Sequence, residues 1–207
     1  MVDDSQNRPS AFDDPRIVNR VETIFENMED NLNLPPKTVA RARSILIDGV
    51  NNSLIDKRGY ETAIAACTLI ACRETDVPRT VKEIGSVVDI QENDILSVSR
   101  KFHAELGIEI STFDAMTFLE RYIEEFDPSQ ETVNKAFDLL MLAQDQDLDN
   151  GRSPSGVAAG ALYAAARLTG ENIKQPDLAA ISDVSEPTIR KNYRTQLEAS
   201  DFSAESA

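Results

Sequence analysis

The chain has 207 residues, of which 41% are hydrophobic and 28% are charged, as in ordinary globular proteins. Acidic residues outnumber basic ones by 36 to 21, so the net charge is −15. The apolar runs are too short to span a membrane, the first residues do not resemble a signal peptide, and two cysteines suggest reduced thiols, so we expect a cytoplasmic protein.

Apolar residues at helical spacing predict five helices in the first half of the chain. The first helix covers Ile17 to Met28, and the second begins at Pro35-Pro36. Residues 60–74 are apolar on nearly every face, which predicts a buried central helix. Thr80-Val81-Lys82-Glu83 is a capping box that opens a short fourth helix. A fifth helix is expected over 91–106.

The second half of the chain repeats the first. A shift of 94 residues places Thr38-Val39 on Thr132-Val133, and a shift of 93 places Ala65-Ala66 on Ala158-Ala159. Apolar residues that match in constant order predict two copies of one unit. The second set of helices is expected over 116–126, 129–143, 154–169, 176–182 and 186–197. The predicted domains are a disordered arm (1–15), a first repeat (16–107), a second repeat (108–199) and a frayed tail (200–207).

Each repeat ends in a short helix, a turn and a longer helix, which is typical of a helix-turn-helix. In the second repeat Ser185 stands at the N-cap position and Pro187 in the first turn of the last helix. That helix carries a polar, cationic set made of Thr188, Arg190, Lys191, Asn192 and Arg194. Such a set suits a major groove, with arginine on guanine and asparagine or threonine adding contacts. A solvated surface helix is the alternative interpretation.

The net charge of the whole chain argues against a nucleic-acid partner, but the local charge does not. Residues 109–149 hold eleven acidic and two basic side chains, whereas both candidate helix-turn-helix regions are close to neutral. An acidic, lysine-poor surface keeps a protein soluble in molar salt, so the composition favours a halophilic source.

Several sequence strings resemble a known family. Residues 65–73 and 77–84 resemble the first cyclin-like repeat of transcription factor IIB and of its archaeal equivalent, transcription factor B. Residues 151–154, 158–163 and 185–194 resemble the second repeat. The resemblance implies an all-α fold of two tandem five-helix cyclin-like repeats, each ending in a helix-turn-helix-like pair.

The resemblance also implies a partner and a site. Members of this family bind the complex of TATA-binding protein with promoter DNA, and the last helix of the second repeat reads an element upstream of the TATA box. The implied contacts with double-stranded DNA are Pro187, Thr188, Arg190, Lys191, Arg194, Arg152, Ser153, Lys57 and Arg58, and those with TATA-binding protein are Arg73, Arg79, Thr80 and Lys82. Pro187 replaces a usual valine, and Lys57-Arg58-Gly59 replaces a Lys-Gly-Arg turn.

The family's N-terminal zinc ribbon has no counterpart in the sequence. A ribbon needs four paired ligands, but only Cys67, Cys72 and His103 occur, and the two cysteines are expected to be core thiols. We therefore expect a natural relative without a ribbon, which contacts RNA polymerase only indirectly or weakly and acts as a regulator or competitor of the full-length factor. Two alternatives stay open. One is a conventional factor whose ribbon is removed or supplied in trans, and the other is a cyclin-fold adaptor that binds protein alone.

Enzyme activity is not expected. A single histidine excludes a Ser/His/Asp triad, and the sequence has no glycine-rich phosphate loop. The sequence indicates no cofactor and no metal.

Overall fold

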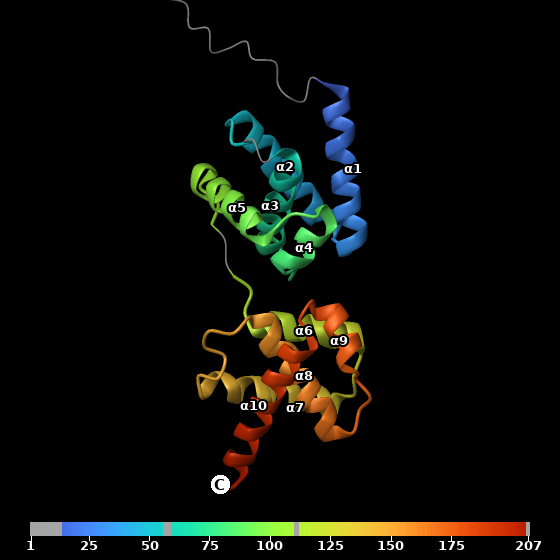
Figure 1. Ribbon diagram of the computed structural model, residues 1–207, viewed down its shortest axis with the longest axis vertical. Coiled ribbons are helices and arrows are strands. Elements are labelled where there is room, and N and C mark those ends of the chain that lie inside the picture. The colour runs from blue at the N-terminus through green and yellow to red at the C-terminus, as the bar shows by residue number, and fades with distance from the viewer. Residues whose placement is uncertain (1–13, 56–58, 110–111, 206–207) are drawn as a thin grey trace, which may run out of the picture. The chain divides into compact units, whose positions relative to one another are not determined.

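The computed structural model describes residues 14–55, 59–109 and 112–205. Within these ranges the chain forms ten helices and no strand, which confirms the predicted all-α class (Figure 1). None of the described helices is both long and apolar enough to cross a membrane. The chain divides into two compact units between residues 111 and 112. The first unit holds α1 (Pro15–Leu32), α2 (Pro36–Asn51), α3 (Gly59–Glu74), α4 (Val81–Val88) and α5 (Glu92–Leu106), and the second holds α6 (Ala115–Phe126), α7 (Gln130–Asp145), α8 (Pro154–Thr169), α9 (Gln175–Ser182) and α10 (Glu186–Glu205).

Each unit is built around its third helix. α3 is buried at every position from Thr62 to Cys72, and α8 is buried over most of its length. Both helices are rich in alanine, whose small side chain lets neighbouring helices approach closely. Cys67 and Cys72 are free thiols inside α3, as predicted, and burial raises the pKa of Cys67 well above its ordinary value.

The repeat extends to individual hydrogen bonds. In the first unit the hydroxyl oxygens of Thr38 on α2 and Thr75 after α3 lie 2.8 Å apart. In the second unit the equivalent pair, Thr132 on α7 and Thr169 on α8, lie 2.6 Å apart. Thr38 and Thr132 are fully buried, so each pair gives a buried hydroxyl the hydrogen-bond partner that it needs.

Apolar contacts hold the last two helices of each unit together. Ile84 of α4 and Ile95 of α5 are fully buried, as are Leu178 of α9 and Ile189 of α10. Val184, in the turn between α9 and α10, is buried as well. These contacts hold each short helix against the longer helix that follows it, as the predicted helix-turn-helix-like pair requires.

The ends of two helices differ from the sequence-based boundaries. α1 begins at Pro15, inside the stretch predicted to be a disordered arm, because Asp14 caps it by accepting a hydrogen bond from the Arg16 amide. The rest of that arm lies outside the described residues. α10 continues to Glu205, where a frayed tail was expected from residue 200 onwards. The helical period beyond Leu197 was too weak to be recognised in the sequence.

A carboxylate from the loop after α8 caps the start of α7. Glu171 accepts hydrogen bonds from the hydroxyl of Thr132 and from the hydroxyl and amide of Ser129, at 2.9 and 3.1 Å for the latter two. These bonds, that from Thr132 above all, lower the pKa of Glu171 below its ordinary value of 4.5. The cap therefore ties the α8–α9 loop to the N-terminus of α7.

The substitution Glu171→Gln is expected to lower the free energy of unfolding at pH 7 by about 0.5–1 kcal/mol, the lower part of the range for a helix cap, because the site is open to solvent. The lowered pKa means that the folded state favours the ionised carboxylate. The wild-type advantage is therefore complete above the unfolded pKa and is lost as the pH falls through the folded one. Urea denaturation at pH 7 and pH 3, at constant ionic strength, measures this difference. Glu125→Gln, the same charge change at an exposed position of α6, is the control, and an equal loss at both pH values would contradict the assignment.

Candidate nucleic-acid interface

The start of α10 is fixed by its own sequence. The amide of Thr188 donates to the carbonyl oxygen of Ser185 at 2.9 Å and also lies 3.4 Å from its hydroxyl. Pro187 has no amide hydrogen, so its place in the first turn leaves no donor unsatisfied. The predicted capping role of Ser185 is thus confirmed.

The inner face of α10 lies directly against two glycines of α8. A Cβ atom added at Gly160 would come within 2.5 Å of the Cβ of Asn192 and 3.0 Å of the Tyr193 amide nitrogen. A Cβ added at Gly156 would come within 3.3 Å of both Asn192 and Thr188. Only glycine permits so close an approach of two helices.

Two buried amide side chains hold α10 against the glycines of α8. Asn192 and Gln196 are each only 3% exposed. The side-chain nitrogen of Gln196 donates to the carbonyl oxygen of Val157 on α8 at 3.1 Å. Asn192 was grouped with the groove-reading residues in the sequence, but its burial excludes that role.

Arg152 holds the same helix from the turn before α8. Its guanidinium donates to the side-chain oxygen of Asn192 at 2.9 Å and lies 3.4 Å from the hydroxyl of Thr195. Ser153, the next residue, caps α8 by accepting a hydrogen bond from the Gly156 amide at 3.2 Å. Both residues are predicted DNA contacts, and this stays a prediction; within the second unit each of them makes the internal contacts given above.

The outer face of α10 presents cations to solvent. Pro187, Arg190, Lys191 and Arg194 are exposed, and Thr188 is half-buried. Within the part of the chain that the structure describes, the side chains of Lys191 and Arg194 have no hydrogen bond or ion pair. Arg190 lies 3.2 Å from the side-chain oxygen of Gln175 and 3.9 Å from that of Glu186.

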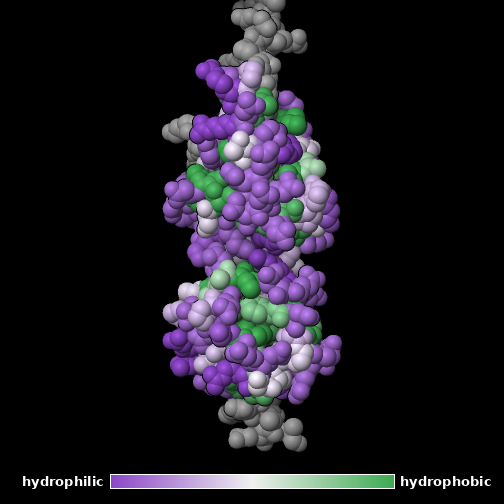
Figure 2. All heavy atoms as spheres, turned by 90° about the vertical axis from the view of Figure 1, so that its right-hand side faces the viewer, coloured by the Kyte–Doolittle hydropathy of each residue, from purple (hydrophilic) through white to green (hydrophobic). Residues whose placement is uncertain are grey.

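Unpaired cations are notable in so acidic a chain. Hydrophilic residues predominate on the face of both units seen in Figure 2. Among the described residues of the first unit, carboxylates pair with Arg16, Arg20, Arg41 and Arg43. Residues 174–197, by contrast, hold four basic side chains and three acidic ones. The local charge is thus slightly positive, and three of the four basic side chains lie on α10.

The first unit uses two of its predicted contact residues internally. The guanidinium of Arg79 donates to the carbonyl oxygen of Leu32, at 2.8 and 2.6 Å, and so caps the C-terminus of α1. The Thr80 hydroxyl accepts from the Glu83 amide at 3.0 Å, and the Glu83 carboxylate accepts from the Thr80 amide, which confirms the predicted capping box. Lys57 and Arg58 lie outside the described residues.

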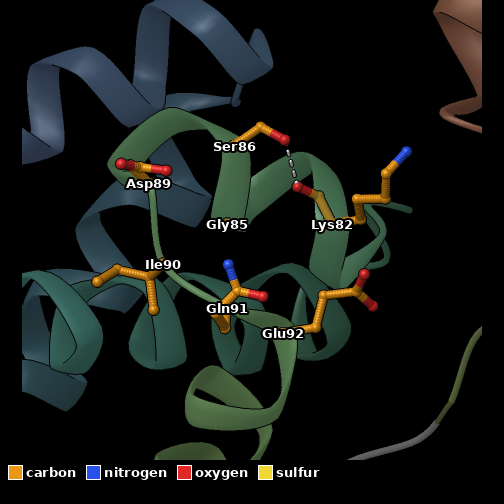
Figure 3. Close-up of a pocket in the computed structure, with 7 residues that line it drawn as sticks. All are labelled: Lys82, Gly85, Ser86, Asp89, Ile90, Gln91 and Glu92. Carbon is orange, nitrogen blue, oxygen red and sulfur yellow. Dashed lines mark hydrogen bonds between the residues drawn. The ribbon is translucent and has the colours of Figure 1, made fainter.

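Lys82 and Arg73 remain at the surface of the first unit. Lys82 is exposed and borders a shallow pocket at the α4–α5 turn, and its amine points away from the other lining residues (Figure 3). The turn is tight, since a Cβ at Gly85 would lie 2.5 Å from the carbonyl oxygen of Ile90. Arg73 is half-buried near the end of α3, and burial lowers the pKa of its guanidinium. No described residue bonds to the Arg73 side chain.

The equivalent helix of the first unit is held differently. Under the 93-residue shift, the positions of Gly156 and Gly160 correspond to Ala63 and Cys67. The close approach lies on α2, where a Cβ at Gly49 would overlap the ring of Phe102 from α5. The close approach at Gly156 and Gly160 and the buried amides of Asn192 and Gln196 therefore belong to the second unit.

The sequence resembles transcription factors over most of its length. Residues 18–103 and 108–199 match the family model described as the transcription factor TFIIB repeat. Transcription initiation factor IIB 6 of Halobacterium salinarum is 34% identical to this chain, over 86% of the chain and 56% of its own length. Transcription initiation factor IIB 3 of the same organism is also 34% identical, over 81% of the chain and 53% of its own length. Transcription initiation factor IIB of Archaeoglobus fulgidus is 33% identical over 84% of the chain and 53% of its own length. The chain thus spans about half the length of the curated relatives it matches.

The substitution Gly160→Ala is expected to lower the free energy of unfolding by about 1–3 kcal/mol, because the added methyl group meets the α10 backbone. Gly156→Ala should cost less, since the three atoms nearest to the added methyl group are side-chain atoms, the closest being the Ser153 hydroxyl oxygen at 2.7 Å, and none is a backbone atom of α10. Thermal and urea denaturation of both variants provide the measurement. Helix propensity alone would stabilise both, so a more stable Gly160→Ala variant would contradict the close packing.

Proposed function

The chain belongs to the transcription factor IIB family, and on that basis we propose that it binds promoter DNA carrying TATA-binding protein and reads the element upstream of the TATA box through α10. One observation carries the proposal: the exposed cations Lys191 and Arg194 stand unpaired on the outer face of a helix whose inner face is locked.

The outer face of α10 has the chemistry for base recognition. Arg190 is the candidate for guanine, because a guanidinium donates two parallel hydrogen bonds to the O6 and N7 atoms of that base. Lys191, and Thr188 at the edge of the face that meets α8, are further candidates for base or phosphate contacts, and Arg194, one turn beyond Arg190, is the candidate for the DNA backbone. Pro187 offers an apolar ring at the first turn, suited to a thymine methyl group.

Salt and charge make the proposed binding depend on the protein partner. In dilute salt a charge of −15 repels phosphates, and at about 1 M salt the Debye length falls to roughly 3 Å, which removes that repulsion. The same salt suppresses the counterion release on which most DNA binders rely. A few base contacts, each worth about 1–3 kcal/mol, give only weak binding on their own. Surface buried against TATA-binding protein must supply the rest.

In the first unit we assign the contact with TATA-binding protein to Arg73 and Lys82. Lys82 is exposed, and the half-buried Arg73 has a guanidinium without a partner among the described residues. Arg79 and Thr80 support this surface by capping α1 and α4.

The double substitution Lys191→Ala and Arg194→Ala is expected to weaken binding to the complex of DNA and TATA-binding protein by roughly tenfold or more, which corresponds to one good base or phosphate contact. Binding of the unaltered chain to naked DNA should be much weaker than to that complex. Gel-shift titrations with and without TATA-binding protein test both points. Arg167→Ala is the control, since it removes an exposed cation near the C-terminal end of α8, beyond the glycines that meet α10. If the double variant binds as well as the unaltered chain, the protein-binding adaptor is the better interpretation.

The 207-residue chain is also expected to compete with a full-length relative for the promoter complex, because both use the same two repeats. Added to an in-vitro transcription reaction driven by the full-length factor, it should reduce the yield of transcript, and the Lys191→Ala, Arg194→Ala variant should not. Stimulation by the unaltered chain would identify a functional initiation factor instead of a competitor.

A further inference from the structure

Arg190 is the one candidate base-reading residue on the described α10 whose side chain has a hydrogen bond or ion pair with a carboxylate or amide side chain. Its terminal nitrogen Nη2 donates to the side-chain oxygen of Gln175 at 3.2 Å. The same nitrogen lies 3.9 Å from a carboxylate oxygen of Glu186, one turn earlier on α10. Gln175 is the first residue of α9, so the contact joins the two helices of the pair.

Both contacts fall on Nη2. An arginine side chain carries five N–H donors in a rigid plane, two of them on Nη2. The hydrogen bond to Gln175 uses one of these two, and the 3.9 Å contact with Glu186 is too long to be a hydrogen bond. The Nη1 and Nε nitrogens of Arg190 bond to no described residue, so the second N–H of Nη2 and that of its neighbouring nitrogen form a pair of parallel donors. A guanine base needs such a pair, and the side chain is 47% exposed.

We propose that Gln175 and Glu186 are positioning residues that fix the Arg190 guanidinium for guanine, an inference that rests on the proposed promoter binding. A free arginine loses conformational entropy when it docks on a base, and a side chain already held in one orientation loses less. The two residues also set the direction of the plane. A guanidinium fixed in this way accepts guanine and rejects bases that cannot take two parallel hydrogen bonds.

The two residues contribute differently. Gln175 is neutral and anchors Arg190 to a second helix, so it sets direction without changing the charge of the interface. Glu186 is negatively charged and stands in the first turn of α10, where a carboxylate also interacts favourably with the helix dipole. It repels DNA phosphates, so its removal raises affinity for any sequence while loosening Arg190. Removal of the Glu186 charge should therefore raise affinity for DNA and lower the preference for guanine.

The test measures binding of the whole chain to DNA with TATA-binding protein, on duplexes in which each G·C pair of the upstream element is replaced in turn by A·T. The unaltered chain should lose roughly tenfold or more at the pair that Arg190 reads, and Arg190→Ala should lose this preference. Gln175→Ala and Glu186→Gln should each reduce the preference at that pair to about threefold or less, with preferences elsewhere unchanged. Glu186→Gln should also bind every duplex more tightly. Gln175→Glu keeps the oxygen that accepts from Arg190 and should retain the preference, while its added negative charge lowers affinity for every duplex.

The controls separate positioning from charge and from stability. Glu198→Gln makes the same charge change on an exposed part of α10 and should alter affinity without altering base preference. Thermal melts should show unchanged folding for all variants, as the substituted side chains are at least partly exposed. If Arg190→Ala abolishes the preference but Gln175→Ala and Glu186→Gln keep it, the positioning role is overturned and the proposed function stands. If the unaltered chain shows no preference at any pair, both are overturned.

Discussion

The close contact between α8 and α10 determines what the second unit can present to a partner. The backbone of α10 approaches α8 at Gly160, and side chains of α10 lie against Gly156, because neither glycine has a side chain in the way. Asn192 and Gln196 then bury their amides at the contact, where the side-chain nitrogen of each donates to a backbone carbonyl oxygen, of Thr188 and Val157 respectively. The result is a helix whose rotation about its own axis is fixed. Its position therefore follows from core packing, not from surface charge.

This arrangement lets a strongly acidic protein keep an exposed cationic face on one helix. Arg152 lies against the inner side of α10, where its guanidinium donates hydrogen bonds to the side chains of Asn192 and Thr195. The outer side keeps Lys191 and Arg194, which no described carboxylate neutralises. The acidic residues of 109–149 belong to α6, α7 and their neighbouring loops. Net charge thus says little about the charge that a ligand meets at one helix.

Features that depend on neighbouring residues in the sequence could be predicted, and those that depend on distant ones could not. The capping box at Thr80, the buried central helices and the N-cap at Ser185 all follow from local chemistry, and all are present. The roles of Arg79, Arg152 and Asn192 depend on partners 40 or more residues away or on tertiary burial. An exposed arginine and a capping arginine look alike in one sequence.

One signal for the α8–α10 contact was nevertheless present in the sequence. Two glycines spaced four apart in an otherwise alanine-rich helix lie on one face, and glycine has a cost in a helix interior that some packing must offset. The spacing marks a crossing point but does not say which helix crosses there. The Gln175–Arg190 contact left no such mark, because nothing in the spacing of the two residues predicts that they meet.

The two units share a framework but secure their last helix in different ways. The paired threonines recur in both units. The ring of Phe102 packs on Gly49 in the first unit, whereas the buried amides of Asn192 and Gln196 hold the last helix of the second. Internal contacts that both copies share leave the remaining contacts of each last helix free to differ. The exposed surface of one unit can therefore change without a change of architecture in the other.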